Sequence, residues 1–374
     1  MRRFLFIAAF ISVLASCGRP AELKLIPSEN FEKVIEGKNV SLYTLKAGDL
    51  VMQVTNFGGR VVSLWVPDRE GNLEDVVLGY ADIDTYVNNP GERFLGAVVG
   101  PYANRIAGGT YSIGEEVYTF PQNNNGQTLH GGLKGLDMVV WDVVSVSEDS
   151  LVLSYLCPDG QDGMPGNRKI VMTYSLTPEN EFKVYYVAET DKATHMNISH
   201  HSFFNLKGEG NGTINDHVLY INASATTPVD SVLIPSGDIA DVTGTPFDFR
   251  EPKAIGTDLE VEDQQLAFGG GYDHNWVLDR KSDDGLELAA SVLEPSSGRY
   301  MEVWTDQPAL QFYGGNFFDG TTMGKYGRTL DYRESIALET QKYPDTPHHA
   351  HFPSTLLTPG QTYTHTCVYR FRIK

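Results

Sequence analysis

The chain has 374 residues, of which 41% are hydrophobic, and its formal net charge is −19. This length suits one large all-β domain or two ordinary domains. The acidity disfavours nucleic acid and anionic membrane surfaces as partners, because both carry negative charge. It also disfavours a phosphorylated substrate, since phosphate is usually held by clustered arginine or lysine.

The N-terminal segment has the features of an export signal. Residues 1–16 read MRRFLFIAAFISVLAS, two arginines before an apolar stretch too short to cross a bilayer as a helix. The ending Leu-Ala-Ser-Cys resembles a bacterial lipoprotein signal, in which the signal peptide is removed and the cysteine, here Cys17, carries the lipid. An ordinary secretory signal cut nearby is the alternative. The first interpretation predicts a lipoprotein facing the periplasm or cell surface, which meets a membrane only through its lipid anchor.

The rest of the chain is predicted to hold a short tether, residues 17–27, and a single domain, residues 28–374. No linker, charge block or short repeat interrupts it. Short runs of Val, Ile, Leu, Tyr and Thr alternate with Gly, Asn, Asp and Pro, and several have the period of half-buried antiparallel strands. Helical periodicity is scarce, with one or two turns expected in 258–268. The fold class is therefore all-β, a large antiparallel β-sandwich. The strands expected include 50–56, 61–66, 139–146, 151–156, 170–176, 182–189, 285–293, 300–304 and 364–373.

The cysteines are candidates for a disulfide, and a histidine cluster is a candidate for a metal site. Export permits a disulfide between Cys157 and Cys367, although two isolated buried thiols are favoured. His348, His349 and His351 lie close in sequence among prolines, which indicates a solvated loop rather than a structural zinc site. We therefore expect no metal.

A histidine pair is the most informative motif. Residues 197–206 read NISHHSFFNL, so His200 and His201 lie between strand-like residues and an aromatic pair. Successive strand side chains point to opposite faces, so only one of the two can enter a given pocket. A strand histidine beside aromatic walls is well placed to exchange a proton near neutral pH.

Four other segments supply polar groups. The first segment places an arginine in a turn flanked by glycines. The second places a histidine before two glycines, where the backbone can approach a ligand closely. A third opens a probable strand with a carboxylate. The fourth ends an apolar run with a glutamate, which is costly to bury unless it is paired or functional. In chain order they read GPYANRIAGG (100–109), NGQTLHGG (125–132), GYDHNW (271–276) and ALETQ (337–341).

Together these segments resemble the aldose 1-epimerase (galactose mutarotase) family, in family order from about residue 25 onward. Further matching pieces are PDG (158–160) leading to MPGN (164–167), TPFDF (245–249) and LQFYGGN (310–316). The resemblance implies a twisted supersandwich with its site in a cleft on one sheet face. It also implies interconversion of the α and β anomers of free aldoses of the glucose or galactose type, with no cofactor.

This reaction needs a base for the proton of the C1 hydroxyl and an acid for the ring oxygen. By resemblance, Glu339 occupies the position of the catalytic glutamate, and the apolar residues before it predict a pKa raised by desolvation. His201 occupies the position of the catalytic histidine. His200 stands where the family usually has asparagine, so it remains an alternative to His201.

The remaining site candidates are sugar-binding residues. Arg105 and His130 are expected to bind sugar oxygens, and His130 also to stabilise charge that develops on the ring oxygen. Asp273 is expected to accept hydrogen bonds from two adjacent hydroxyls. Asn104 is expected to hold the arginine loop or contact a hydroxyl, and Tyr313 to contact the C–H face of the sugar. The alternatives are a surface ion pair for Arg105, a turn-stabilising role for His130 and loop capping for Asp273.

Two aromatic residues and a proline complete the sequence candidates for the site. Phe247 and Phe312 are candidates for apolar walls, with core packing expected for at least one of this aromatic set. Pro101 stands where many family members carry a second arginine, which alters the loop but leaves the position of Arg105 intact.

Two rival functions fit this sequence less well. A hexose-6-phosphate 1-epimerase of the same superfamily would need a basic phosphate clamp, which an acidic chain with one obvious site arginine fits poorly. A sugar-binding lipoprotein without catalysis would have no need for both Glu339 and His201. The enzyme is therefore favoured, with a small-molecule sugar as its partner; no oligomeric state is predicted.

Overall fold

The computed structural model describes residues 23–88, 91–282 and 285–374. The predicted signal peptide and Cys17 lie outside the described residues. Ile26, near the end of the expected tether, is buried, and its backbone exchanges two hydrogen bonds with the side chain of Gln53. Within the described ranges, no helix has the length and apolar character needed to cross a membrane.

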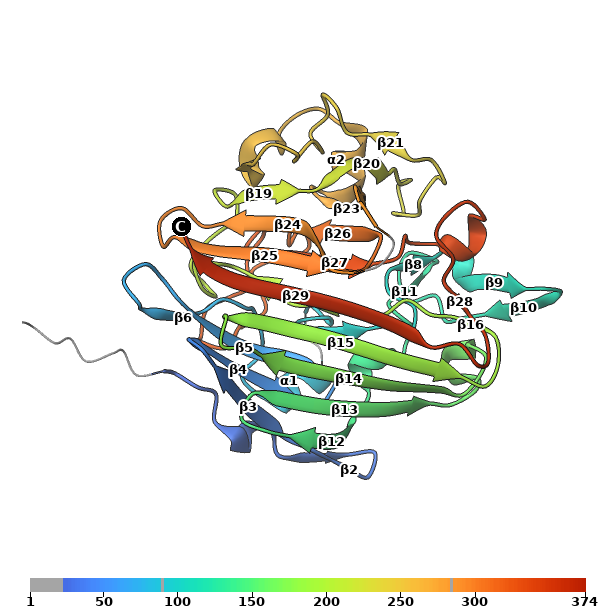
Figure 1. The fold of residues 1–374 in the computed structure, drawn as a ribbon, viewed down its shortest axis with the longest axis horizontal. Coiled ribbons are helices and arrows are strands. Elements are labelled where there is room, and N and C mark those ends of the chain that lie inside the picture. Colours follow the sequence, from blue (N-terminus) through green and yellow to red (C-terminus); the bar gives the residue numbers. More distant parts are fainter. Residues whose placement is uncertain (1–22, 89–90, 283–284) are drawn as a thin grey trace, which may run out of the picture.

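The largest sheet has nine strands, and every pairing in it is antiparallel. Figure 1 shows the long strand β29, in red, lying between β15 and β25. Across the sheet the order is β12 (Asp142–Val146), β13 (Ser150–Cys157), β14 (Arg168–Leu176), β15 (Glu181–Thr190), β29 (Tyr363–Ile373), β25 (Arg299–Thr305), β24 (Glu287–Leu293), β19 (Val218–Ile221) and β22 (Lys253–Ala254).

Two smaller sheets complete the main architecture. The six-stranded sheet has the order β18 (Phe203–Phe204), β27 (Ile336–Gln341), β26 (Ala309–Tyr313), β23 (Asp273–Leu278), β20 (Ala223–Thr227) and β21 (Ala240–Asp241). The four-stranded sheet has the order β3 (Leu42–Ala47), β4 (Leu50–Thr55), β5 (Arg60–Pro67) and β6 (Leu73–Asp75).

Short strand pairs and helices fill the connections. The pairs are β1 (Lys33–Ile35) with β2 (Lys38–Val40), β7 (Ala97–Val99) with β17 (Ser199–His201), β8 (Arg105–Ile106) with β11 (Thr128–Leu129), β9 (Thr110–Ile113) with β10 (Glu116–Thr119), and β16 (Thr194–His195) with β28 (Leu356–Leu357). The α-helices are α1 (Ile83–Asn88) and α2 (Gln264–Gly269), and the 3-10 helices are η1 (Ser28–Phe31), η2 (Ala107–Gly109), η3 (Leu136–Met138), η4 (Gln161–Gly163), η5 (Ile255–Asp258) and η6 (Thr346–His348).

The core explains why these strands form. Alternate residues of β14 and β15 are buried, as the period of two requires when one sheet face is covered. The main hydrophobic cluster joins Met172 of the nine-stranded sheet, Phe312 of the six-stranded sheet and Met52 of the four-stranded sheet. The sheets therefore pack face to face, which confirms the predicted all-β antiparallel sandwich.

Most predicted strands agree with the structure, with one informative difference. Residues 139–146 were expected to form a strand, yet β12 begins only at Asp142. Before it, the carbonyl of Val139 accepts from Gly58 and the N–H of Trp141 donates to Asn56, so this backbone pairs with another segment. Cys157 and Cys367 are both free and buried, as two isolated thiols.

Candidate active site

Adjacent strands of the six-stranded sheet present polar side chains on one face. Gln311 of β26 lies opposite Glu339 of β27, and Tyr313 of β26 lies opposite Asp273 of β23. Residues two apart on a strand share a face, so these four side chains lie on the same side of the sheet. Glu339, Asp273 and Tyr313 line a cavity of about 150 Å³. The intervening Phe312 packs in the core instead.

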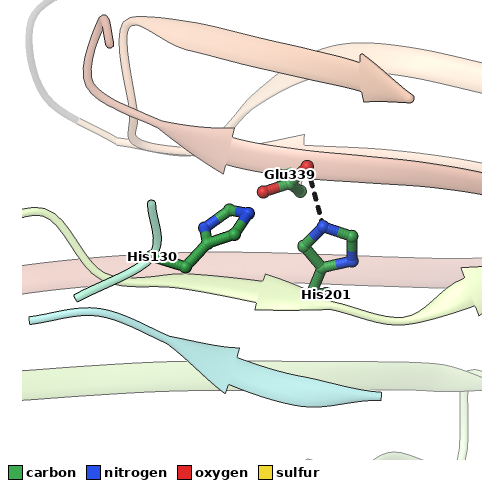
Figure 2. Close-up of side chains that lie close together, drawn as sticks. All are labelled: His130, His201 and Glu339. Atoms are coloured by element: carbon green, nitrogen blue, oxygen red, sulfur yellow. Dashed lines mark ion pairs between the residues drawn. The ribbon is translucent and has the colours of Figure 1, made fainter. Parts of the chain in front are cut away.

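The histidine pair divides between this cavity and the core. His201 lines the cavity, and its Nε2 lies 3.3 Å from Oε1 of Glu339, as Figure 2 shows. His200 points away, where its ring nitrogens lie 3.1 Å from the hydroxyl of Tyr174 and 2.6 Å from that of Ser202. The alternation along β17 therefore places His201, rather than His200, in the pocket.

Arg105 reaches the cavity from the short β8–β11 pair. Its Nε donates to Oδ1 of Asn124 at 3.2 Å, and its Nη2 lies 3.6 Å from Oδ2 of Asp273. Asn104 has a positive φ of 63°, and its Oδ1 accepts the N–H of Arg105 at 2.9 Å. Asn104 therefore shapes the turn that presents the arginine, and it also lines the cavity.

The same turn fixes the protonation of His130. The backbone N–H of Asn104 donates to Nδ1 of His130 at 3.1 Å, and the N–H of His130 donates back to the carbonyl of Asn104 at 3.1 Å. Because Nδ1 accepts, the proton of the neutral ring must lie on Nε2. Figure 2 shows this ring directed toward the carboxyl of Glu339. His130 therefore offers an N–H donor at the reacting end of the cavity.

Burial controls the electrostatics of the site. It raises the pKa of the Glu339 carboxyl well above its usual range, and the nearby carboxyls of Asp273 and Glu92 add to the rise. Burial also lowers the pKa of His201 to about 3, and it holds that of His130 well below its usual value with help from His201. The sequence predicted a raised pKa for Glu339, because the residues before it are apolar.

Several buried polar atoms here have no partner in the protein. Among the described residues, Oε2 of Glu339, Nδ1 of His201 and Oε1 of Gln311 accept or donate no hydrogen bond. The Glu339 and His201 side chains are only 2% and 5% exposed. Buried polar groups are rarely left unpaired in folded proteins, so each exception calls for a physical explanation. The arrangement therefore offers a paired acid and base, an N–H donor and unpaired acceptors around one small cavity.

Comparisons with known proteins agree with this geometry. The family model described as Aldose 1-epimerase matches residues 41–370. The chain belongs to the aldose 1-epimerase family. Galactose mutarotase of Mus musculus is 40% identical over 337 residues, covering 90% of this chain and 95% of that protein. Aldose 1-epimerase of Escherichia coli (strain K12) is 34% identical over 340 residues, covering 90% and 96%.

Solved structures support the same assignment. An aldose epimerase homologue from C. elegans superposes with a TM-score of 0.82 at 29% identity, covering 89% of this chain and 99% of that one. The protein is therefore an isomerase, and it interconverts the anomers of a sugar as its family does.

The epimerase site also contains the one group of described residues whose spacing could hold a metal. Ligand atoms of His130, His201 and Glu339 all lie within 4.8 Å of one another. The hydrogen bond from Asn104 decides against His130 as a ligand, because it uses the lone pair on Nδ1 and so keeps the proton on Nε2. A protonated ring nitrogen has no lone pair for a metal. Two ligands remain, which is fewer than the three protein ligands of a typical catalytic zinc site.

Some residues of the epimerase site were not predicted from the sequence. Asn124, Glu92, Phe94 and Phe317 line the cavity, and Gln311 donates to Oδ1 of Asp273 at 2.7 Å. The signal for Gln311 was available, because a polar residue two positions before Tyr313 must share its face of the strand. Glu92 lies in a segment with no motif, so its place follows only from the fold.

Other sequence candidates lie away from the epimerase cavity. Phe247 packs against Tyr272 and Trp276 in the core, as Phe312 does. Pro101 is buried beside the arginine turn, where its carbonyl accepts the N–H of Asn197 at 2.8 Å.

The histidines of the C-terminal loop also lie outside the cavity. His348 and His349 face the carboxylate of Asp345, at 2.7 and 3.6 Å. His351 lies 2.7 Å from the carbonyl of Gly237. These three histidines do not form a metal-type cluster in the described part of the chain.

Proposed function

We propose that this isomerase interconverts the α and β anomers of free aldoses of the glucose or galactose type by acid–base ring opening and closure. We further propose that it acts outside the cytoplasm, as a lipoprotein tethered through Cys17. The observation that carries the catalytic proposal is the 3.3 Å approach of Glu339 and His201 at the buried end of one cavity. The C1 hydroxyl and the ring oxygen are bonded to the same carbon, so an acid and a base that lie close together can serve both.

The reaction needs only proton transfers and one bond rotation. The pKa directions of the pair place its single proton on Glu339 at rest, so the reactive state forms when that proton moves to His201. The Glu339 carboxylate then takes the proton of the C1 hydroxyl, while the His201 imidazolium gives a proton to the ring oxygen. The bond between C1 and the ring oxygen breaks, which leaves an open-chain aldehyde. Rotation about the C1–C2 bond presents the other face of the aldehyde, and closure reverses both transfers. The pair keeps one proton in total before and after the reaction.

The other side chains position the sugar. Nε2–H of His130 is placed to donate to the ring oxygen as negative charge develops there, and removing such a donor typically costs about 10²- to 10³-fold in rate. Arg105 can donate to a hydroxyl, whereas Asp273 can accept. Because His130, Arg105 and Asp273 line the cavity before substrate arrives, little reorganisation is required.

The charges of the cavity support an unphosphorylated substrate. One guanidinium, that of Arg105, faces three carboxyls, those of Glu92, Asp273 and Glu339. A phosphate dianion would meet more negative than positive charge. A neutral polyol can instead donate hydroxyl protons to the carboxylates.

Anomer exchange measured by NMR tests the catalytic proposal. The purified protein should accelerate exchange for at least one of glucose, galactose, xylose and arabinose, and EDTA should leave the rate unchanged. Exchange at the buffer rate for all four sugars would contradict the proposal. Loss of activity in EDTA with recovery in zinc would contradict the metal-free route.

Cell fractionation tests the anchor. The proposal of a lipid anchor rests on the Leu-Ala-Ser-Cys sequence of residues 14–17. Cys17→Ser should release the protein from the membrane fraction or block its processing, because stable anchoring needs lipid at this residue. A variant that remains with membranes as the wild type does would rule out the lipid anchor.

A further inference from the structure

The segment that follows β27 packs against the turn that carries Arg105. Glu339 lies in β27, and Asp345 comes shortly after the end of this strand. The backbone N–H of Asp345 donates to the carbonyl of Arg105 at 3.0 Å. Oδ1 of Asp345 accepts the N–H of Ala107 at 2.9 Å. Asp345 therefore holds the backbone of the turn at the arginine and again just after it.

The turn around Arg105 is short, and its backbone is unusual on both sides. Its strand, β8, pairs with β11 over two residues. Asn104 and Gly108, which flank β8, both have left-handed backbone, with φ of 63° and 60°. A residue other than glycine keeps this conformation only where its surroundings hold it there. The path of the backbone through Arg105 therefore needs support from outside the turn, and Asp345 supplies two hydrogen bonds.

The guanidinium of Arg105 is held less firmly than its backbone. Its Nε donates to Oδ1 of Asn124 at 3.2 Å, the long end of the range for such bonds. Its Nη2 lies 3.6 Å from Oδ2 of Asp273, which is too far for a hydrogen bond. A shift of the turn would therefore carry the guanidinium with it.

Asp345 is itself fixed by its neighbours. Its side chain is only 2% exposed, and its oxygens lie 2.7 Å from Nδ1 of His348 and 3.6 Å from Nε2 of His349. Next to it, the N–H of Thr346 donates to the hydroxyl of Tyr102, a fully buried residue, at 3.0 Å. A buried carboxylate is costly unless it is paired, so these contacts favour one fixed position for Asp345. Two histidines that lie outside the sugar cavity thus surround a carboxylate that contacts the arginine turn.

We propose that Asp345 is a positioning residue for the epimerase reaction, because it fixes the turn that presents the Arg105 guanidinium to the sugar. Asp345 is not among the residues that line the cavity, so it acts through the turn and not by contact with the substrate. Glu339 and Asp345 belong to one continuous segment, which therefore supports both the base and the sugar-binding arginine. The inference rests on the proposed function, in which Arg105 donates to a sugar hydroxyl.

A double-mutant cycle tests whether Asp345 acts through Arg105. Anomer exchange is measured by NMR with the most active of glucose, galactose, xylose and arabinose. Asp345→Ala should raise KM by about 10-fold with a smaller change in kcat, the same division that Arg105→Ala should show, because a lost hydroxyl contact weakens substrate binding. In the Arg105→Ala protein, adding Asp345→Ala should change KM by less than about twofold. The same rise in KM in both backgrounds would overturn the positioning role.

The conservative variant separates the hydrogen bond from the charge. Asn tolerates left-handed backbone, which Asp345 adopts with φ of 54°, and its side-chain carbonyl can still accept the N–H of Ala107. Asp345→Asn should therefore keep KM within about twofold of the wild type. If Asp345→Asn raises KM as much as Asp345→Ala does, the bond to Ala107 does not position the arginine and the inference is wrong.

Ala107→Pro tests the same hydrogen bond from its other end. It removes the donor and leaves Asp345 in place, so the test does not depend on the folding of Asp345→Ala. Ile106, before it, has the extended backbone that a residue preceding proline prefers. KM should rise as it does for Asp345→Ala, and an unchanged KM in Ala107→Pro would contradict the positioning role.

Asp306→Ala is the matched control for losing such a bond. The carboxylate of Asp306 also accepts a backbone N–H, that of Thr366 at 3.0 and 2.9 Å, but it does not line the cavity. KM should stay at the wild-type value in this variant. A rise equal to that of Asp345→Ala would show a general effect of the lost bond and overturn the assignment to Asp345.

The same measurements separate this inference from the proposed function. If the wild type accelerates exchange and Arg105→Ala raises KM, but the cycle is additive, the positioning role fails and the proposed function stands. If the wild type exchanges none of the four sugars, the proposed function fails and the positioning role falls with it.

Discussion

Buried ionisable side chains gather around Glu339 and, elsewhere among the described residues, around Lys325. Nζ of Lys325 contacts Oδ2 of Asp75 at 2.7 Å and Oε2 of Glu209 at 3.2 Å, and it donates to the carbonyls of Val62 and Val77. None of these three charged side chains has an unpaired buried atom, whereas Glu339 and His201 each have one.

This difference separates a structural cluster from a reactive one. The Lys325 cluster joins the 314–335 loop to β5 and β6, and every buried polar atom of its three charged side chains has a hydrogen-bond partner in the protein. Around Glu339, the protein supplies donors and acceptors but leaves part of them for a substrate. A buried ionisable group therefore indicates chemistry only when its hydrogen bonds are incomplete.

The largest expected effect is on catalysis by the Glu339 cluster. Glu339→Gln keeps the size of the side chain but removes the base, and His201→Asn removes the acid. Each should lower kcat by roughly 10²- to 10⁴-fold, with KM changed far less. Thermal unfolding should show no large loss of stability for Glu339→Gln, because no protein donor binds Oε2. Near-normal kcat for either variant would show that the reactive pair has been misassigned.

The opposite pattern is expected for the Lys325 cluster. Lys325→Met leaves Asp75 and Glu209 without their cation, and breaking a buried ion pair costs about 3–5 kcal/mol. The unfolding midpoint should therefore fall strongly, while kcat for glucose in the folded protein stays within a few-fold. Lys38→Met is the control, because its pair with Asp142 is exposed and should contribute little. Unchanged stability in Lys325→Met would remove the distinction between the two clusters.

A smaller effect is expected at His200, which lies next to a reactive residue but belongs to the core. His200→Asn loses the contacts with Tyr174 and Ser202, and an unsatisfied buried group costs about 1–3 kcal/mol. Chemical denaturation should show this loss, whereas kcat should change far less than in His201→Asn. Equal losses of kcat in the two variants would contradict the assignment of opposite faces.

The subtlest expectation concerns pH. Burial raises the pKa of Glu339 and lowers that of His201 to about 3, so the pair holds one proton over the whole range between these values. Below this pH range the Glu339–His201 pair gains a second proton, and above it the pair loses its only proton. Either change should abolish kcat/KM. The profile should therefore be broad, with its acid limb near pH 3. An acid limb at about 4.3, the ordinary value for glutamate, would show that the pair is not desolvated.

Neighbouring charge should move the alkaline limb of that profile. The carboxyl of Glu92, whose own pKa burial raises to about 6, helps to raise the pKa of Glu339. Glu92→Gln removes this repulsion, so the alkaline limb should move to lower pH. A shift to higher pH would contradict this sign.

The sequence predicted the parts of the fold that depend on local pattern. Alternation predicted residues 182–189 as a strand, and β15 spans Glu181–Thr190. Residues 139–141 were wrongly included in a strand, because apolar composition does not show which backbone groups another segment will pair. The short helix α1 (Ile83–Asn88) left no clear period and was not predicted.

The site residues also fall into those that the sequence predicted and those that only the fold places. Glu339, His201, Arg105, His130 and Asp273 stand in motifs, and the structure brings them around one cavity. The proton position on His130 was not predictable, because it depends on the backbone N–H of Asn104 in a turn with positive φ. Glu92 and Phe317 reach the cavity from loops, whose paths are not encoded in a strand or helix period.

Strand β29 joins two halves of the largest sheet that are synthesised far apart. β15 ends at Thr190 and β25 begins at Arg299, and β29, which starts only at Tyr363, lies between them. Until β29 leaves the ribosome, the edges of β15 and β25 have no partner, and unpaired edges are prone to aggregation. The central ladder therefore cannot close until the residues of β29 have been synthesised, although most of its strands precede them in the chain.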